Sequence, residues 1–189
     1  MATRPVLQFD VEYPEHLSRG LIFVKWLLAI PHIIILYALQ AVSGVIGFIA
    51  WFAILFTGRY PVGLFNFQLM YLRWAVRVGV YIALLRDEYP PFGDQPYPMT
   101  LQLDYPEQLS RWKIFLKIIF LIPHYLVLSL LAVASLLLSF VAWWAILITG
   151  RYPRGLFDFN VGVMRWGYRV QAYQMLLTDA YPPFTLEQV

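Results

Sequence analysis

The sequence predicts an all-α membrane protein made by tandem duplication, with two transmembrane helical hairpins, amphipathic interfacial helices and a minor β-strand pair. Three observations predict this fold. The 189 residues are 60% hydrophobic and only 13% charged, two long apolar runs are nearly free of charge, and one set of motifs occurs twice. Soluble domains carry roughly 25% charged residues, and a soluble chain of this length could not bury so much apolar surface. Lipid is therefore the expected solvent for the excess.

The internal repeat has a constant offset of 92 residues, which separates Tyr13 from Tyr105. The offset needs no gap, and it predicts two units, residues 4–95 and 96–187. The segments that it superimposes are Tyr13–Glu15 on Tyr105–Glu107, Leu17–Arg19 on Leu109–Arg111, Ile30–His32 on Ile122–His124, Thr57–Pro61 on Thr149–Pro153, and Tyr89–Phe92 on Tyr181–Phe184.

These shared segments resemble the bacterial membrane family catalogued as domain of unknown function 4389. The resemblance lies in the Leu-Ser-Arg, Ile-Pro-His, Thr-Gly-Arg-Tyr-Pro-x-Gly-Leu-Phe and Tyr-Pro-Pro-Phe segments, and it covers nearly the whole chain because both units carry them. It implies a membrane location. The family has no established activity, substrate or catalytic residue, so the resemblance implies nothing about chemistry.

Each unit opens with a short stretch in which apolar and polar residues alternate, at residues 6–12 and 99–104. Alternation of this kind predicts a half-exposed strand. Because a single strand cannot satisfy its own backbone, we expect the two to pair as a small surface sheet. Ser18 and Ser110 follow as candidate N-caps of the first long helix in each unit.

The apolar run from Leu21 to Thr57 has 37 residues with Lys25 as its one charge, and the run from Ile114 to Thr149 contains only Lys117. One crossing needs about 20 residues, so each run fits a hairpin that turns near residues 41–44 or 132–135. The rival is a short interfacial helix up to Pro31 followed by one long tilted crossing. The hairpin is favoured because it places all 14 Lys and Arg residues on one side of the membrane, and cytoplasmic loops are enriched in these residues.

The third segment of each unit, residues 64–85 and 156–177, carries a narrow cationic stripe on an apolar helix. Such a helix suits the headgroup boundary, where arginine reaches phosphate. The preceding Thr-Gly-Arg-Tyr-Pro segments are predicted to be structural corners, in which glycine ends one helix and proline starts the next. The candidate lipid-headgroup ligands are Arg59, Arg73, Arg77, Arg151, Arg165 and Arg169.

His32 and His124 occupy equivalent positions after prolines inside the apolar runs. Facing each other across a pseudo-twofold axis, they would be candidate cofactor ligands for haem iron or another metal. The favoured interpretation is local: each ring would bond a carbonyl that proline frees, or an interfacial group. No Cys or carboxylate lies nearby in the sequence, so we expect no cofactor and no metal.

Asp158 and Arg165 lie two turns apart on one helix face, but Asn66 replaces the acid in the first unit. A proton relay would need the acid in both units, or would depend on this difference between them. The favoured interpretation is instead an ion pair or a helix cap.

The sequence contains no hydrolase triad, no phosphate-binding glycine loop and no metalloprotease helix, so we expect a protein that is not an enzyme. The net charge of +3 is explained by anionic lipid without nucleic acid. The favoured function is an accessory or scaffold subunit of a membrane complex with lipid-headgroup contacts. The alternatives are a membrane-shaping hairpin protein and a small transporter or channel. The expected location is the inner (plasma) membrane, multi-pass with both termini cytoplasmic, with membrane lipids and a larger complex or a homo-oligomer as partners.

Overall fold

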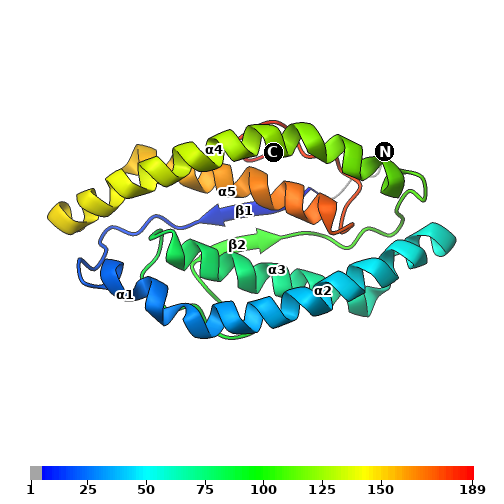
Figure 1. Ribbon diagram of the computed structural model, residues 1–189, viewed down its shortest axis with the longest axis horizontal. Coiled ribbons are helices and arrows are strands. Elements are labelled where there is room, and N and C mark those ends of the chain that lie inside the picture. The colour runs from blue at the N-terminus through cyan, green and yellow to red at the C-terminus, as the bar shows by residue number, and fades with distance from the viewer. Residues whose placement is uncertain (1–5) are drawn as a thin grey trace.

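The computed structural model describes residues 6–189, so the first two residues of the predicted unit 4–95 lie outside it. The elements follow the repeat (Figure 1). The first unit contributes β1 (Gln8–Val11), α1 (Leu21–Leu28), α2 (Ile30–Thr57) and α3 (Val62–Ile82), and the second contributes β2 (Met99–Gln102), α4 (Lys113–Thr149) and α5 (Arg154–Gln174). The duplication predicted from the sequence is therefore visible in the order of elements.

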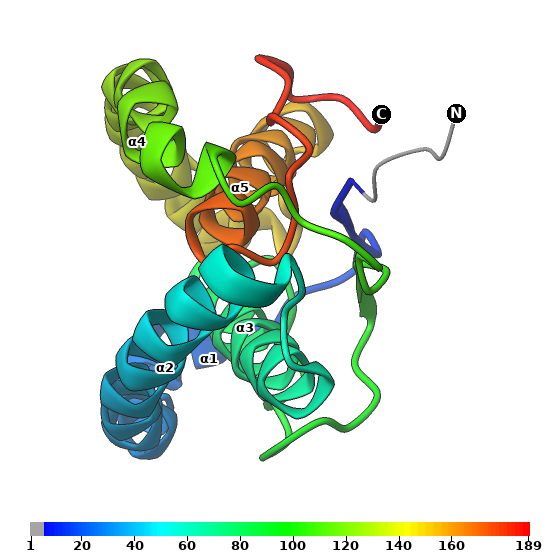
Figure 2. The ribbon, with the colours of Figure 1, turned by 90° about the vertical axis from the view of Figure 1, so that its right-hand side faces the viewer.

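The elements form three layers (Figure 2). The long helices α2 and α4 make one face of the molecule, α3 and α5 form the middle layer, and the two strands lie on the opposite side. In Figure 1 the two long helices run in opposite directions, as their colours show, and so do α3 and α5. The two units are thus related by a pseudo-twofold axis that is perpendicular to the layers.

The predicted hairpin turns are wrong, because each apolar run is one continuous helical rod. Residues 21–57 are helical except for a turn at Ala29, and α4 continues without interruption through Pro123. The first unit therefore resembles the rival interpretation, with a short α1 that ends just before Pro31. Ser43 does not break α2, since its hydroxyl donates to the Gln68 side chain on α3 at 2.5 Å. Ser135 of α4 bonds Asn160 of α5 in the same way.

The predicted corners are confirmed. Gly58 and Gly150 end α2 and α4 in the left-handed conformation, with φ of 71° and 70°, which glycine adopts without the steric cost of a β-carbon. Pro61 and Pro153 then precede the first turns of α3 and α5. The Thr57 hydroxyl accepts the Arg59 backbone N–H at 3.1 Å, which fixes the chain where it reverses direction.

The predicted strand pair is also confirmed. β1 pairs antiparallel with β2, with Phe9 opposite Leu101. Each strand packs against or hydrogen-bonds the middle-layer helix of the other unit. For β1 this helix is α5, whose Arg165 donates to the Phe9 carbonyl at 2.7 Å. Phe9 and Leu101 are both buried in a core that contains residues of both units. The units 4–95 and 96–187 are therefore repeats in sequence that share one core in space.

The helices α3 and α5 were predicted to lie at the headgroup boundary. Instead they are the central layer, between the long helices and the strands, and much of each is buried. Their arginine stripe faces the strand side, where it bonds the backbone of β1 and β2. The amphipathic pattern is therefore explained by packing between two layers of the same protein.

Candidate membrane-binding site

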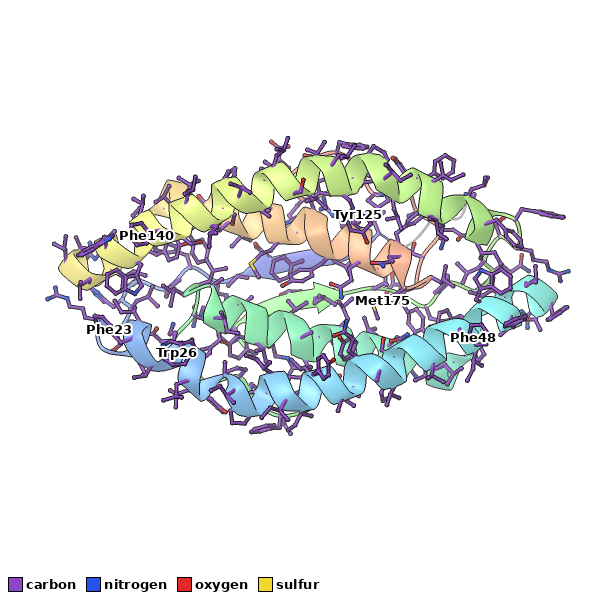
Figure 3. All side chains as sticks on the ribbon, in the orientation of Figure 1. Phe23, Trp26, Phe48, Tyr125, Phe140 and Met175 are labelled. Carbon is purple, nitrogen blue, oxygen red and sulfur yellow. The ribbon has the colours of Figure 1, made fainter. Side chains whose placement is uncertain are left out.

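The outer face of α1, α2 and α4 is an exposed apolar surface (Figure 3). Both 37-residue runs, Leu21–Thr57 and Lys113–Thr149, are long and apolar enough to cross a membrane, by length and composition, and few of their residues are buried. None of the exposed residues in 21–57 or 114–149 is charged. We call this surface the apolar face. Its largest exposed side chains include Trp26, Ile34, Tyr37, Phe48, Phe56, Ile118, Leu126, Leu130, Leu136, Phe140 and Ile148.

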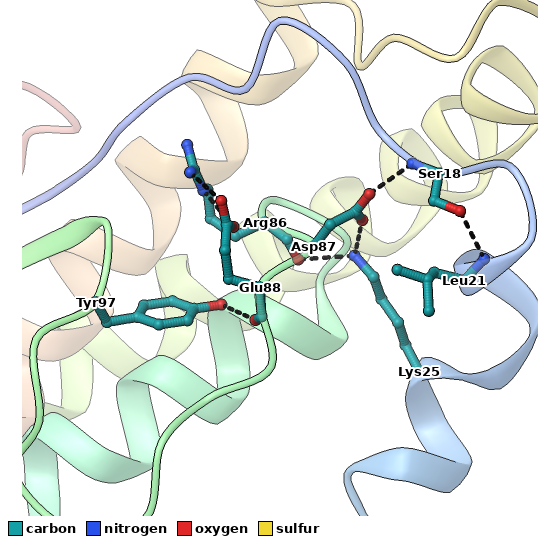
Figure 4. A network of polar contacts seen from close by, with 7 residues as sticks. All are labelled: Ser18, Leu21, Lys25, Arg86, Asp87, Glu88 and Tyr97. Atoms are coloured by element: carbon teal, nitrogen blue, oxygen red, sulfur yellow. Dashed lines mark hydrogen bonds and ion pairs between the residues drawn. The ribbon is translucent and has the colours of Figure 1, made fainter.

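The face stays uncharged because Lys25 and Lys117 are both buried; Figure 4 shows the contacts of Lys25. Lys25 Nζ lies 2.7 Å from Asp87 Oδ1 and also donates to the Arg86 carbonyl at 2.7 Å. Lys117 makes the equivalent ion pair with Asp179 at 3.0 Å. Each ammonium also lies over a tyrosine ring, 5.0 Å from the Tyr81 centroid in the first unit. The two charges within residues 21–57 and 114–149 are therefore neutralised by the loop that follows α3 or α5.

The predicted arginine stripe has protein partners. Arg77 is 1% exposed; its guanidinium bonds Asp94 at 3.0 Å and donates to the Gln95 carbonyl at 2.8 Å. Burial lowers the pKa of Arg77 from its ordinary value, and Asp94 opposes that shift. Arg73 shares Asp94. The structure therefore places both residues in contacts between α3 and the chain that follows it.

In the second unit, Arg165 pairs with Asp10 at 2.8 Å, and Arg169 donates to the carbonyls of Leu7 and Glu187. Burial lowers the pKa of Arg169 as well. Lipid binding by these four arginines stays a prediction, but all four have structural partners inside the protein. Asp158 is exposed, and the acid that pairs with Arg165 is Asp10, so the expected Asp158–Arg165 ion pair does not form.

A different group of cations lacks an acidic partner in the part of the chain that the structure describes. These residues flank the ends of the apolar face, and the group consists of Arg19, Arg59, Arg111, Lys113 and Arg151. A β-carbon placed on Gly150 would lie 3.6 Å from Arg19 Nε, and one on Gly58 would lie 3.5 Å from Arg111 Nε. Each end of the molecule therefore combines cations from both units. We call these the basic ends.

Two of the predicted ligands, Arg59 and Arg151, belong to the basic ends and are exposed. Sequence reasoning missed Arg19, Arg111 and Lys113. The signal was present, since each lies within three residues of the start of an apolar run, but the Leu-Ser-Arg motif was used only to establish the repeat. The proximity of Arg111 to Gly58 and of Arg19 to Gly150 is a tertiary contact, because it joins the start of one unit to the corner of the other.

Each predicted histidine is buried in an aromatic cage formed by its own unit. Trp74 Nε1 donates to His32 Nδ1 at 3.0 Å, and Phe92 stacks on the imidazole with centroids 4.1 Å apart. Trp166 and Phe184 hold His124 with the same distances. The Tyr-Pro-Pro-Phe motif is thereby explained, since Tyr89 and Phe92 both contact the ring of His32. The predicted carbonyl partner is wrong, because the ring accepts a hydrogen bond from an indole.

This hydrogen bond does not fit metal ligation. Because the indole N–H occupies the Nδ1 lone pair, the neutral ring carries its proton on Nε2. A metal ligand needs a free lone pair on that nitrogen. Over residues 6–189 no group of three or more His, Cys, Asp or Glu side chains is placed to hold a metal ion. Each indole–imidazole bond joins two helices of one unit, α2 to α3 through His32 and Trp74, and α4 to α5 through His124 and Trp166.

Comparison with known proteins gives one result. The family described as domain of unknown function (DUF4389) matches residues 19–93 and 111–185. No curated protein and no solved structure matches the chain. The two matched segments begin just before the apolar runs and end with the Tyr-Pro-Pro-Phe cages, so they contain the helices and leave out the strands. The chain therefore belongs to the family of unknown function DUF4389, of which it contains two tandem copies.

Proposed function

We propose that this chain is a membrane protein that lies along one leaflet of a bilayer and wedges it. The apolar face would lie among the acyl chains, the basic ends would lie at the phosphates, and the strands would face water. The observation that carries the proposal is the uncharged face of two long helices with unpaired cations at both of its ends. Arginine and lysine at the edge of an apolar surface extend toward headgroups.

The length of the helices favours this orientation. A 37-residue helix is about 55 Å long, whereas the hydrocarbon core is about 30 Å thick. A crossing would need a steep tilt, while a helix in the plane of the membrane has no such constraint. The apolar face is also shared by two helices at one side of the molecule (Figure 2), as a surface that enters one leaflet requires.

The position of the strands gives a second argument. β1 and β2 lie near the middle of the long axis of the molecule (Figure 1). If that axis crossed the bilayer, β1 with Asp10 would lie at hydrocarbon depth, although the Asp10 side chain is 60% exposed. An exposed carboxylate there costs about 3 kcal/mol, and the unpaired strand edges would cost more. With the axis in the membrane plane, the same groups stay in water.

Insertion into one leaflet is the basis for a membrane-shaping role. Helices that enter only the outer part of a leaflet expand it relative to the other leaflet, so their binding depends on curvature. Here two antiparallel helices insert together on a rigid support. The accessory-subunit role stays a prediction without a surface that favours it. The transporter alternative also stays a prediction: polar groups within the bundle, such as Lys25, His32 and Ser43, bond neighbours in the first unit, and such pairs are as compatible with packing as with a transport path.

Single cysteines test the orientation cleanly, because the chain has none of its own. Spin labels at Leu27, Ala41 and Phe56, all exposed along α1 and α2, should report similar shallow depths in vesicles. A label at Thr100 on β2 should report water. A crossing helix would instead place Ala41 deepest, with the other two labels near opposite surfaces, and that profile would reject the proposal.

The sidedness of the two ends gives an independent readout. Cysteines at Glu15 and Val62, both exposed, should react with a membrane-impermeant thiol reagent from the same side of the membrane. Purified protein should also tubulate anionic vesicles. Leu137→Glu on the apolar face should abolish tubulation, and Thr100→Glu on the water side should not. Labelling from opposite sides, or tubulation unchanged by Leu137→Glu, would contradict the model.

A further inference from the structure

A groove lies within the apolar face, where the C-terminal half of α2 faces the N-terminal half of α4. Its volume is about 650 Å³, which is within the range of small-molecule sites. Phe48 borders it from α2, Tyr125 from α4, and Met175 closes it from the end of α5, as the labelled side chains in Figure 3 show. The groove is thus built by both units and opens on the surface that we place in the membrane.

Two polar side chains of the groove have partners. Lys117 is paired with Asp179, and Gln174 accepts the Tyr125 hydroxyl at 2.6 Å. Most of the remaining lining is aliphatic or aromatic, including Trp51, Phe52, Ile118 and Ile122. An apolar chain would therefore contact mostly carbon and would leave these two polar pairs intact.

One basic end lies beside the mouth of this groove. Lys113 precedes Ile118 by five residues, which is about 7.5 Å along the helix. Arg59 follows α2 directly, and Arg111 lies against Gly58 at the same corner. None of the three has an acidic partner within residues 6–189. The site therefore combines an apolar slot with a cluster of free cations at one end.

We propose that this groove holds an acyl chain of an anionic phospholipid, whose phosphate binds Arg59, Arg111 and Lys113. The inference rests on the proposed function, which brings the groove into contact with lipid. It goes further by assigning one resident lipid to one defined place. The charge of the end and the apolar lining match the two parts of such a molecule, and cationic side chains at an apolar edge bind phosphate.

The pseudo-equivalent groove, between the N-terminal part of the first apolar run and the C-terminal part of α4, has a different lining. The repeat offset places Trp26 where the second unit has Ile118, and Trp144 where the first has Phe52. It also places Ala29 where the second unit has Leu121. The two grooves therefore differ in shape, and the proposal concerns the one that contains Ile118.

The first test measures lipid that stays with the purified protein. Protein extracted in mild detergent from membranes that contain phosphatidylglycerol should retain one phospholipid by native mass spectrometry. Ile118→Trp copies the residue of the other unit and should lower this occupancy by about fivefold or more, because it fills the slot. Leu130→Trp, at a site that is 73% exposed, is the matched control and should leave occupancy unchanged.

The second test uses the unaltered chain, so it does not depend on whether a variant folds. A phosphatidylglycerol analogue with a photoreactive acyl chain should crosslink to the groove around Phe48 and Ile122 more than to Leu136 on the open face. Even crosslinking, or equal retention by Ile118→Trp, would overturn the lipid site. Flat insertion without retained lipid would reject this site alone, whereas retained lipid with a crossing orientation would reject the proposed function alone.

Discussion

The hydroxyl of Tyr13 donates a hydrogen bond to the backbone carbonyl of Tyr152, at 2.5 Å, across the boundary between the two units. Tyr105 makes the same bond to the carbonyl of Tyr60 in the opposite direction. In each case the segment ahead of an apolar run lies on the corner that ends the other apolar run, and the backbone bond from Leu17 to Gly150 at 2.8 Å reinforces it. Each corner is therefore held by the other unit.

We expect Tyr13→Phe and Tyr105→Phe each to lower the free energy of unfolding by about 1 kcal/mol, the usual net value of such a bond. The two losses should add, because the bonds lie at separate corners. Thermal unfolding in detergent gives the measurement. Tyr37→Phe, at a site that is 77% exposed, is the matched control. Equal stability of all three variants would show that the corners do not depend on these hydroxyls.

His32→Gln should be tolerated better than His32→Leu, because the glutamine carbonyl can still accept the Trp74 N–H. The expected difference in unfolding free energy is about 1–3 kcal/mol, the cost of an unpaired buried group. The same pair of changes at His124 is an internal repeat of the experiment. If His32→Leu is more stable than His32→Gln, both in the otherwise native chain and in a Trp74→Phe background, the hydrogen bond does not stabilise the cage.

The basic ends should control affinity for anionic membranes. Neutralising Arg59 and Arg151 together should weaken binding to phosphatidylglycerol vesicles, by about 1 kcal/mol for each charge. The loss should shrink as salt is added. Binding to neutral vesicles should not change. Arg77→Gln is the contrasting variant, because Arg77 is buried with Asp94; it should lower stability and leave vesicle affinity intact. If Arg77→Gln weakened vesicle binding more than the changes at Arg59 and Arg151 did, the arginine stripe would be the lipid-binding site instead.

Alkaline pH should destabilise the fold through its buried tyrosines. Burial raises the pKa of Tyr60 to about 12 from an ordinary value of 10.0. Below pH 10 the phenol is protonated in both states, so its contribution to stability is fully present. As pH rises from 10 through about 12, the unfolded chain ionises first and stability is lost. Tyr60→Phe should show a smaller loss over this window in detergent, as followed by circular dichroism, and an unchanged slope would contradict the assignment.

The sequence predicted what depends on local pattern. The constant offset gave the two units, alternation gave the paired strands, and the Gly-Arg-Tyr-Pro segments gave the corners. The hairpin turns failed because Ser43 and Ser135 were taken as breaks, although their hydroxyls bond residues on α3 and α5. Those partners lie 25 residues away along the chain, so no local pattern shows them.

The predicted location of the arginine-bearing helices, at the headgroup boundary, was wrong for a similar reason. A cationic stripe on an apolar helix has the same sequence pattern whether its arginines bind lipid phosphates or backbone carbonyls. Arg165 bonds Phe9, which is 156 residues earlier in the chain, and this contact exists only because the opening strand of one unit lies on the other unit. The His32 and Trp74 pair was likewise beyond reach, since each residue had a separate local explanation.

The exchanged opening segments have a consequence for a half-length chain. In a single copy of residues 4–95, the carbonyls of Tyr60 and Gly58 would lack their hydrogen-bond donors, and the segment around Tyr13 would lack the corner on which it packs. Two such copies could supply these contacts to each other, by pairing their strands and by packing each opening segment on the corner of the other copy. One repeat expressed alone should therefore assemble as an obligate symmetric dimer with the same outline as the full chain, from which it would differ by lacking the connection between the repeats.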